Sequence, residues 1–309
     1  METTKNTRKA LKAGTWYTAE KQLLQKELQN WLQNCKIQQQ IIPQIKSFKA
    51  LIGPHAGLSY CGKTGAYAYQ YLINKNNNKL NVFLLGPSHR HRMFKCGLTQ
   101  FDEFETPLGN IQINQQILQE LAKNNDLFET LPKEADLNEH SLELHLPWIQ
   151  QMLKNTNFQL IPIMVGGIDK HQMQMYGKLL APYFDDENTV FIISSDFCHW
   201  GERFGYTFYK NEQKQGQQKK TPIYQSIQNL DKQGIQIIEK QDLKQFQQYL
   251  DDTGNTICGR RPIQILLETI NQSKNKQQIK TSFLSYDQSG QCLEKTDSSV
   301  SYASLITYI

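Results

Sequence analysis

Histidine side chains follow three apolar segments of this chain at the points where those segments end. His55 comes directly after FKALIGP, and His89 comes directly after NVFLLGPS, with His91 two positions further on. The segment TVFIISSD is followed within three positions by Cys198 and His199. Imidazole is a common ligand of zinc, copper, nickel and iron, and thiolate favours the softer ions. A hydrogen bond to a loop carbonyl explains any one of these histidines, but three such positions among seven histidines favour a shared metal site.

The segment NEHSLELHLPW offers a second set of candidate ligands. His140, Glu143 and His145 have the spacing H-x-x-E-x-H, which matches neither of the zinc-binding helix patterns H-E-x-x-H and H-x-x-E-H. On a helix, His140 and His145 would lie about 140° apart, so they cannot easily share an ion. We therefore expect a buried structural role for one of them. Glu139 and His140 can still reach a ligand crevice from the start of a helix.

Cys258 lies in NTICGRRP, directly before a segment that looks helical. The start of a helix lowers the pKa of a cysteine and favours the thiolate. The alternative is that Cys258 is a small apolar residue packed under the helix. Arg260 and Arg261 are adjacent. They can attract an anion, or they can be ordinary surface charges.

Strands and helices alternate along the chain and must position these side chains. Four short apolar segments closed by Gly, Pro or Ser are predicted as strands buried on both faces: 48–54, 81–88, 158–167 and 189–196. In open α/β sheets, ligands bind beyond the carboxyl ends of such strands. The sheet is therefore expected to bring the histidines into one crevice.

Helical periodicity marks four further segments: 18–34, 114–124, 170–184 and 259–272. Thr18 is the expected N-cap of the first segment, and Pro262 suits the first turn of the last. KTSFLSYDQSG and SSVSYASLITYI are predicted as two more strands, which can pair antiparallel. The predicted fold class is α/β, a single domain over residues 1–309 with a central mixed, largely parallel sheet flanked by helices.

Composition limits the classes of partner. The net charge of +5 comes from 34 basic and 29 acidic residues spread along the chain, so no basic block favours nucleic-acid binding. The six cysteines include no C-x-x-C pair and fit reduced thiols of an intracellular protein. A polar N-terminus and the lack of a membrane-length apolar segment predict a cytoplasmic protein with no membrane insertion. The low-complexity segments 74–79 and 211–220 are predicted as a loop tip and a solvated insertion.

Several motifs together resemble one known family. AGTWYTAE, PHAGLSYCG, LGPSHRH, EHSLELHLPW, SSDFCHWGERF, NTICGRRPI and DSSVSYAS occur in this order with near-continuous spacing over essentially the whole chain. They are similar to motifs of the Memo family, named for mediation of ErbB-driven cell motility. The segments 74–79 and 211–220 are where this chain departs from the family pattern.

The resemblance implies a fold and a set of site residues. Memo proteins share the fold of class III extradiol dioxygenases, which hold ferrous iron with two His and one Glu and use a further His as acid/base. By motif, His55 and His89 fall on the two histidine ligands, and Cys258 falls where those enzymes have the Glu. His199, with Asp196 beside it, falls on the acid/base position.

The resemblance also implies cofactors and partners. Replacing a carboxylate by a thiolate shifts the preference of the site from ferrous iron toward a softer ion such as copper. Memo proteins are described as copper-binding and redox-active, with iron also proposed, and as linked to phosphotyrosine peptides and cytoskeletal control. Trp16, Tyr60, Arg203 and Phe204 are the matching aromatic and basic candidates for peptide binding.

Three hypotheses follow. In the first, a copper- or iron-binding, redox-active protein with a vestigial dioxygenase site signals to cell motility and the cytoskeleton. In the second, the same crevice retains metal-dependent oxygenase or oxidase activity, with His199 and Asp196 as its catalytic pair. In the third, the crevice is a scaffold that binds a phosphotyrosine peptide or another signalling protein.

Overall fold

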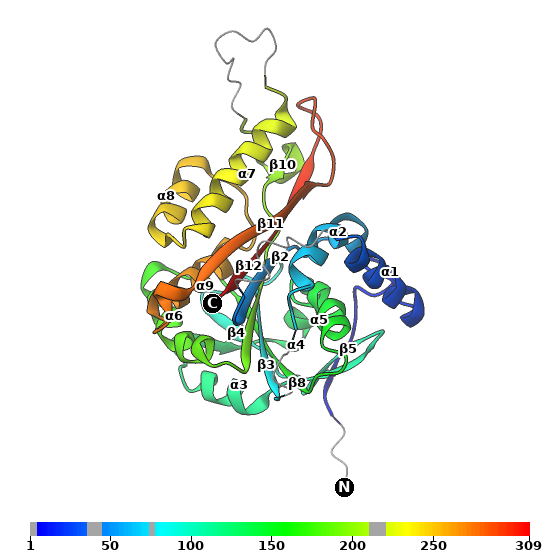
Figure 1. Cartoon of the computed structure of the whole chain (residues 1–309), viewed down its shortest axis with the longest axis vertical. Coiled ribbons are helices and arrows are strands. Elements are labelled where there is room, and N and C mark those ends of the chain that lie inside the picture. Colours follow the sequence, from blue (N-terminus) through cyan, green and yellow to red (C-terminus); the bar gives the residue numbers. More distant parts are fainter. Residues whose placement is uncertain (1–4, 36–44, 74–77, 210–220) are drawn as a thin grey trace.

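The computed structural model of the chain describes residues 5–35, 45–73, 78–209 and 221–309. Its centre is a nine-stranded sheet with helices on both faces, and the α/β class predicted from the sequence is confirmed (Figure 1). The strands of this sheet, in spatial order, are β10 (His199–Trp200), β12 (Ser299–Tyr308), β2 (Phe48–Gly53), β9 (Thr189–Ser194), β3 (Leu80–Pro87), β8 (Phe158–Val165), β4 (Cys96–Leu98) and β7 (Phe128–Thr130). The ninth strand, β11 (Lys280–Gln288), pairs with β12.

The sheet is parallel at its centre and antiparallel toward its margins. β2, β9, β3 and β8 run in one direction, whereas β12 is antiparallel to β2, β10 and β11, and β4 is antiparallel to β8. The four predicted buried strands are thus the parallel core, and the two C-terminal strands form the expected antiparallel pair. A second, small sheet contains β1 (Thr7–Arg8), β5 (Glu103–Thr106) and β6 (Gly109–Gln112).

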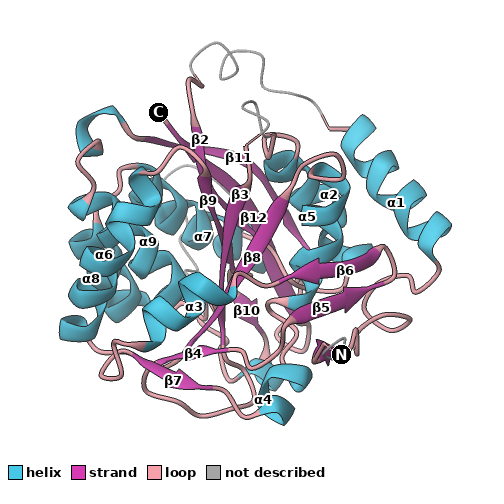
Figure 2. Cartoon of the chain, turned by 90° about the horizontal axis from the view of Figure 1, so that it is seen from below, coloured by secondary structure: helices cyan, strands magenta, loops and turns pink. Residues whose placement is uncertain are grey.

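Helices cover both faces of the large sheet (Figure 2). One face carries α1 (Lys21–Gln33), α2 (Leu58–Tyr69) and α5 (Leu146–Met152). The other carries α6 (Lys170–Asp185), α9 (Arg260–Gln272), α8 (Leu243–Thr253) and α7 (Ile223–Glu239). The shorter elements are α3 (Gln115–Ala122), α4 (Lys133–Asn138) and the 3-10 turns η2 (Glu143–His145), η3 (Glu202–Phe204) and η4 (Lys276–Gln278). None of the described helices combines the length and apolar character needed to cross a membrane.

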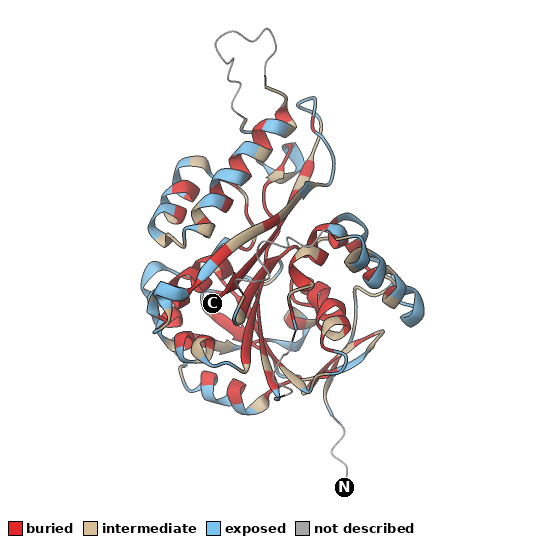
Figure 3. Ribbon diagram, viewed as in Figure 1, coloured by how far each residue is buried: buried red, intermediate tan, exposed pale blue. Residues whose placement is uncertain are grey.

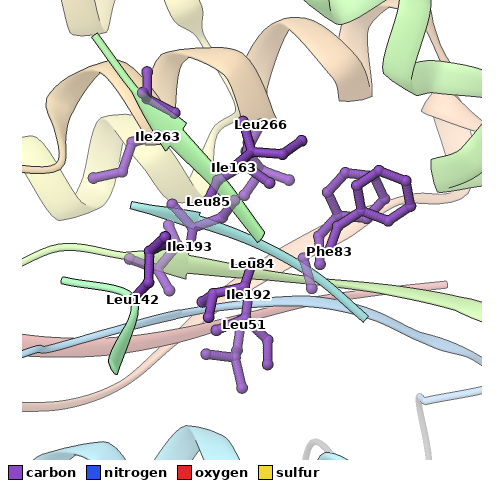
Figure 4. Close-up of a cluster of buried hydrophobic side chains, with 14 of the residues drawn as sticks. Leu51, Phe83, Leu84, Leu85, Leu142, Ile163, Ile192, Ile193, Ile263 and Leu266 are labelled. Carbon is purple, nitrogen blue, oxygen red and sulfur yellow. The ribbon is translucent and has the colours of Figure 1, made fainter. Parts of the chain in front are cut away.

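The core follows from the two-residue period of the strands. Leu84 is level with Ile192, and Leu85 is level with Ile193. The paired residues of neighbouring strands therefore direct their apolar side chains to the same face of the sheet. Leu85 and Ile193 lie toward Ile263 of α9 in Figure 4. Both faces of the central strands are buried (Figure 3), which explains why these segments are continuously apolar instead of alternating.

One predicted helix start is wrong. Thr18 does not cap the first helix, because its hydroxyl donates to the carboxylate of Glu27. α1 begins at Lys21, and the side chain of Glu20 accepts the free amides of its first turn. The other three predicted helices are confirmed as α3, α6 and α9. The low-complexity predictions fall on residues 74–77 and 211–220, which lie outside the described residues, and on Asn78 and Lys79.

The strand register brings three chain segments to one edge of the sheet. Gly53 at the end of β2 is level with Ser194 at the end of β9, and Leu85 of β3 is level with Ile193. The residues that follow these three strands therefore leave the sheet side by side, as the rule for ligand sites in α/β folds requires.

Candidate metal centre

Three potential ligands converge beyond the carboxyl ends of β2 and β3. One nitrogen each of His55 and His89 and the sulfur of Cys258 lie within 4.8 Å of one another. Cys258 Sγ lies 3.2 Å from His55 Nε2, and the two imidazole rings are 5.1 Å apart between centroids. The structure thus brings together the three residues proposed as ligands from the sequence.

Cys258 reaches this position because α9 starts very close to the end of β9. A Cβ atom on Gly259 would lie 2.3 Å from the Cβ atom of Ser195, so only glycine permits this approach. The Gly259 amide donates to Ser195 Oγ, and the Asp196 amide donates to Cys258 Sγ at 3.3 Å. These contacts hold the sulfur toward the two histidines.

The expectation that the helix start lowers the pKa of Cys258 is wrong. Desolvation by the surrounding residues raises the pKa of the thiol well above its ordinary value, and the carboxyl of Asp196 raises it further. These effects outweigh the backbone hydrogen bonds from Asp196 and Gly259 and the charge of Arg260, all of which lower the pKa. A bound cation reverses this balance, because a coordinating thiol is deprotonated by its metal.

His55 is held by a neutral hydroxyl. Its Nδ1 lies 2.6 Å from Ser194 Oγ, and Ser194 donates its single hydroxyl proton to the carbonyl of Ser141 at 2.7 Å. Ser194 must therefore accept from the Nδ1–H of His55, which leaves the lone pair of Nε2 directed toward Cys258. Burial lowers the pKa of His55 well below its ordinary value, so the imidazole is in the neutral form that binds a metal.

His89 is held by a carboxylate. Its Nδ1 lies 2.8 Å from Glu139 Oε1, and its backbone amide donates to Glu139 Oε2 at 2.6 Å. The amides of His140 and Ser141 also donate to Oε1, both at 2.9 Å. Burial alone would raise the pKa of Glu139, but these hydrogen bonds and the nearby histidines lower it to about 2. The carboxylate is therefore ionised and fixes the Nδ1–H tautomer of His89.

His89, Glu139 and His140 form a second group with metal-ligand spacing. Oε1 of Glu139 already accepts three N–H groups, from His89 Nδ1 and from the amides of His140 and Ser141. This oxygen has no lone pair left for an ion. Glu139 is therefore an anchor of His89. Glu139 and His140 lie beside His89 as expected, but they follow the end of α4 instead of starting a helix.

Asp196 and His199 complete the crevice. Asp196 Oδ1 accepts the amide of His55 at 2.9 Å, and Oδ2 lies 4.0 Å from His55 Nε2. Burial raises the pKa of Asp196 to about 7. His199 Nδ1 donates to the carbonyl of Phe197 at 2.9 Å, which leaves Nε2 with a free lone pair, and burial lowers the pKa of this imidazole. The two groups have the protonation properties of an acid/base pair.

Trp16 and Phe204, two of the four peptide-binding candidates, contact histidines of this crevice. The Trp16 ring is 4.5 Å from His140, which in turn stacks on His89 at 4.4 Å. Arg203 lies over the Phe204 ring at 4.5 Å, and Phe204 contacts His199 edge-on at 5.2 Å. Tyr60 is 65% exposed, at the start of α2. Aromatic rings therefore lie against His140 and His199, two histidines of the crevice.

Other sequence candidates have structural surroundings. His145 is fully buried and bonds Tyr69, which fits the structural role expected for one histidine of its motif. Cys198 and Trp200 are buried in the core. All six cysteines are free.

Sequence reasoning missed two of the residues that orient the histidines. Ser194 lies inside a predicted strand, and nothing in its neighbours marks it as different from other serines. Glu139 is predicted near the crevice, but its hydrogen bonds to the amides of His89, His140 and Ser141 depend on a turn and a tertiary contact that only the folded chain shows.

Known proteins resemble this chain over nearly its whole length. The sequence model of the family described as Memo-like protein matches residues 8–306. Protein MEMO1 of Homo sapiens is 41% identical over 299 residues, covering 96% of this chain and 95% of the relative. Protein MEMO1 of Danio rerio is 42% identical with the same coverage, and the memo-1 homolog of Caenorhabditis elegans is 38% identical over 98% of this chain and 83% of its own length.

A solved structure also resembles the chain. The crystal structure of an uncharacterized protein from Escherichia coli K12 covers 83% of this chain and 99% of its own, with 13% identity and a TM-score of 0.47.

Proposed function

Since this chain belongs to the Memo-like protein family, we propose that it binds a copper or iron ion between His55, His89 and Cys258 and uses it in redox chemistry. The observation that carries the proposal is the convergence of these three donor atoms within 4.8 Å, from segments far apart in the sequence. Both histidines present Nε2 with its lone pair free, because Ser194 and Glu139 hold their Nδ1–H groups. The residues present therefore fit a transition-metal ion.

The donor set favours a soft or borderline ion. Two neutral imidazoles and one thiolate suit copper or iron, whereas magnesium and calcium take oxygen ligands. When bound, such an ion supplies Lewis acidity and one-electron redox chemistry. Thiolate in place of a carboxylate is also the reason for proposing that the dioxygenase activity of the related fold is vestigial here.

The residues around the ligands have definable tasks. Asp196 can hold or release a proton near neutral pH, because burial raises its pKa to about 7. His199 can accept a proton at Nε2, since its Nδ1–H is committed to the carbonyl of Phe197. Trp16 and Phe204 place apolar rings against His140 and His199 and so limit the access of water to the crevice.

A signalling role is the second part of the proposal. We extend to this chain the role of relaying signals to cell motility and the cytoskeleton, through a phosphotyrosine peptide or a signalling protein. Support comes from a guanidinium and aromatic rings: Arg203 suits a phosphate group, and the half-buried Phe204 and the exposed Tyr60 suit an aromatic ring. A cytoplasmic location goes with this role.

An oxygenase or oxidase is the alternative function. The observation that favours it is the acid/base character of Asp196 and His199, which simple metal storage does not need. Oxygen consumption by the metal-loaded protein with catechols would support this alternative, provided that His199→Asn abolishes it. Equal oxygen consumption by His199→Asn would contradict it.

Metal content is the decisive measurement. The protein is purified without affinity-tag histidines or added metal, then titrated anaerobically with Cu(I) and with Fe(II). We expect close to one ion per chain in the wild type, and loss of binding in His89→Ala and Cys258→Ala. His171→Ala and Cys35→Ala serve as matched controls, because both residues lie outside the candidate group and should leave binding unchanged. Unchanged binding in Cys258→Ala would show that the assigned site is wrong.

A further inference from the structure

Tyr69 and His145 form a buried pair that the proposed function does not use. Both side chains have no exposed surface, and the Tyr69 hydroxyl lies 2.5 Å from His145 Nδ1. Nε2 of His145 is also buried, and it has no hydrogen-bond partner among the described residues. A buried polar atom left without a partner destabilises a protein, so this arrangement calls for a reason.

The hydrogen bond between the pair has a defined direction. If Tyr69 donates to Nδ1, the only unsatisfied group is the Nε2–H of His145. If Nδ1–H donates instead, both the phenol proton and the Nε2 lone pair are unsatisfied. The first arrangement leaves fewer unpaired groups, so Tyr69 donates. Burial lowers the pKa of His145 to about 3, so its imidazole is neutral and Nδ1 is free to accept.

Aromatic rings lead from this pair to the surface. Tyr69 stacks on Trp148 with ring centroids 5.2 Å apart and planes within 7° of parallel. Trp148 lies 5.9 Å from Trp31. Trp148 is buried on α5, whereas Trp31 lies partly exposed on α1. The three rings therefore form a continuous series from the interior to Trp31, which lies at the protein surface on α1.

The inner end of this series lies against the strand that leads into the crevice. A Cβ atom on Gly53 would lie 3.6 Å from His145 Cε1 and 4.0 Å from Tyr69 Cε2. Gly53 precedes the candidate ligand His55 by two residues and is level with Ser194, which anchors His55. Only one strand end separates the buried pair from the crevice.

We infer that Tyr69, Trp148 and Trp31 form a route along which single electrons move between the crevice and the protein surface, with His145 as the proton acceptor of Tyr69. The stacked contact of Tyr69 with Trp148 and the tilted contact of Trp148 with Trp31 are both short enough for electron transfer between rings. A hydrogen-bonded base allows a phenol to lose an electron and a proton together. The use of this route in the cell depends on the proposed function, because it needs an oxidising reaction in the crevice.

A peroxyl radical in the crevice takes an electron from Tyr69 and becomes a peroxide anion, while the phenol proton moves to His145 Nδ1. The phenoxyl radical takes an electron from Trp148 and recovers its proton from His145. Trp148 then takes an electron from Trp31, and a thiol in solution reduces Trp31. The net result is transfer of one electron from the thiol to the peroxyl radical: the thiol becomes a thiyl radical, and its proton passes through water to the peroxide anion.

Pulse radiolysis of the metal-free protein tests this route directly. Azide radicals take one electron from accessible indoles and become azide ions. In the wild type we expect a rapid conversion of indolyl absorbance into phenoxyl absorbance, at a rate independent of protein concentration, because the same rings then carry an electron in the reverse direction, from Tyr69 to Trp31. Tyr69→Phe keeps the ring and its stacking but lacks the phenol, so it should lose this phase.

Two tryptophan variants identify the indole that the azide radical oxidises. Trp31→Phe should also lose the rapid phase, and because Trp31 is partly exposed this variant is expected to fold even if Tyr69→Phe does not. Trp16→Phe is the matched control: Trp16 is equally half-buried but contacts His140 and not Trp148, so the phase should persist. A rapid phase that survives in Tyr69→Phe or Trp31→Phe, or is absent from the wild type, would overturn the inference.

The experiment separates this inference from the proposed function, because it uses no metal. A protein that binds copper or iron but lacks the rapid phase would retain the proposed function and lose the relay. A protein that shows the phase but binds no metal would retain the relay and lose the proposed function. In metal-loaded protein treated with hydrogen peroxide, we expect oxidation products at Trp31, found by peptide mass spectrometry and reduced in Tyr69→Phe.

Discussion

The two histidines of the candidate centre perform the same task with different supports. His55 is 1% exposed and is held by the neutral hydroxyl of Ser194, whereas His89 is 27% exposed and is held by the ionised carboxylate of Glu139. Glu139 remains ionised because three backbone amides donate to it. Asp196, beside His55, has fewer such donors, and burial raises its pKa to about 7. A buried carboxylate charge is therefore stabilised beside His89 and disfavoured beside His55.

This difference should affect how each imidazole binds a metal. An anionic acceptor on Nδ1–H makes the opposite nitrogen a stronger donor than a neutral hydroxyl does. We therefore expect His89 to be the stronger of the two proposed ligands, and its anchor to matter more than that of His55.

The largest difference between the anchors Glu139 and Ser194 should appear in the free energy of unfolding at acidic pH. The folded pKa of Glu139 is about 2, below its ordinary value of 4.5, so its contribution to stability is full above about pH 4.5 and is lost as pH falls toward 2. This contribution is at most about 3 kcal/mol. Urea unfolding of metal-free protein between pH 7 and pH 3 should show a steeper acid loss for wild type than for Glu139→Gln. Ser194→Ala should keep the wild-type slope, since serine does not titrate in this range.

Removal of the carboxylate anchor should weaken metal binding most among the anchor variants. Glu139→Ala leaves the Nδ1–H of His89 and three backbone amides without their acceptor, and we expect Cu(I) or Fe(II) affinity to fall by up to about 100-fold. Anaerobic titration measures this change. Glu134→Ala removes an exposed glutamate of α4 and should bind like the wild type. Equal affinity of Glu139→Ala and wild type would contradict the anchoring role.

Removal of the hydroxyl anchor should have a smaller effect. Ser194→Ala leaves only His55 Nδ1–H and the Ser141 carbonyl unpaired, and we expect about a tenfold loss of affinity in the same titration. Ser304→Ala is the control, because it also removes a buried hydroxyl that donates to a carbonyl, that of Thr64. A loss larger than that of Glu139→Ala would reverse the ranking of the two histidines.

The smallest effect is expected at Ser141. Its hydroxyl donates to the carbonyl of Pro87, so Ser141→Ala should reduce the free energy of unfolding by about 1 kcal/mol. Metal affinity should be unchanged, because Ser141 contacts both anchors through backbone atoms that alanine retains. A clear loss of affinity would mean that the hydroxyl itself positions the site.

The main elements of the fold were predictable from local patterns. Continuous apolar segments predict strands buried on both faces, and their carboxyl ends predict a crevice with His55 and His89. Only the family resemblance adds Cys258 to these two ligands. The pKa of Cys258 was not predictable, because the helix-start rule ignores the desolvation that the folded chain imposes. The anchor Ser194 and the contact of Tyr69 with Trp148 join residues that are far apart in sequence, so only tertiary packing reveals them.

A single peptide segment connects the two supports. The amide of Ser141 donates to Glu139, and the carbonyl of Ser141 accepts from Ser194. A local opening of the turn at residues 139–141 therefore detaches both histidine anchors at once. Amide hydrogen exchange at Ser141 reports this opening. We expect the exchange to slow when a metal binds, so that one backbone proton serves as a reporter of the entire centre.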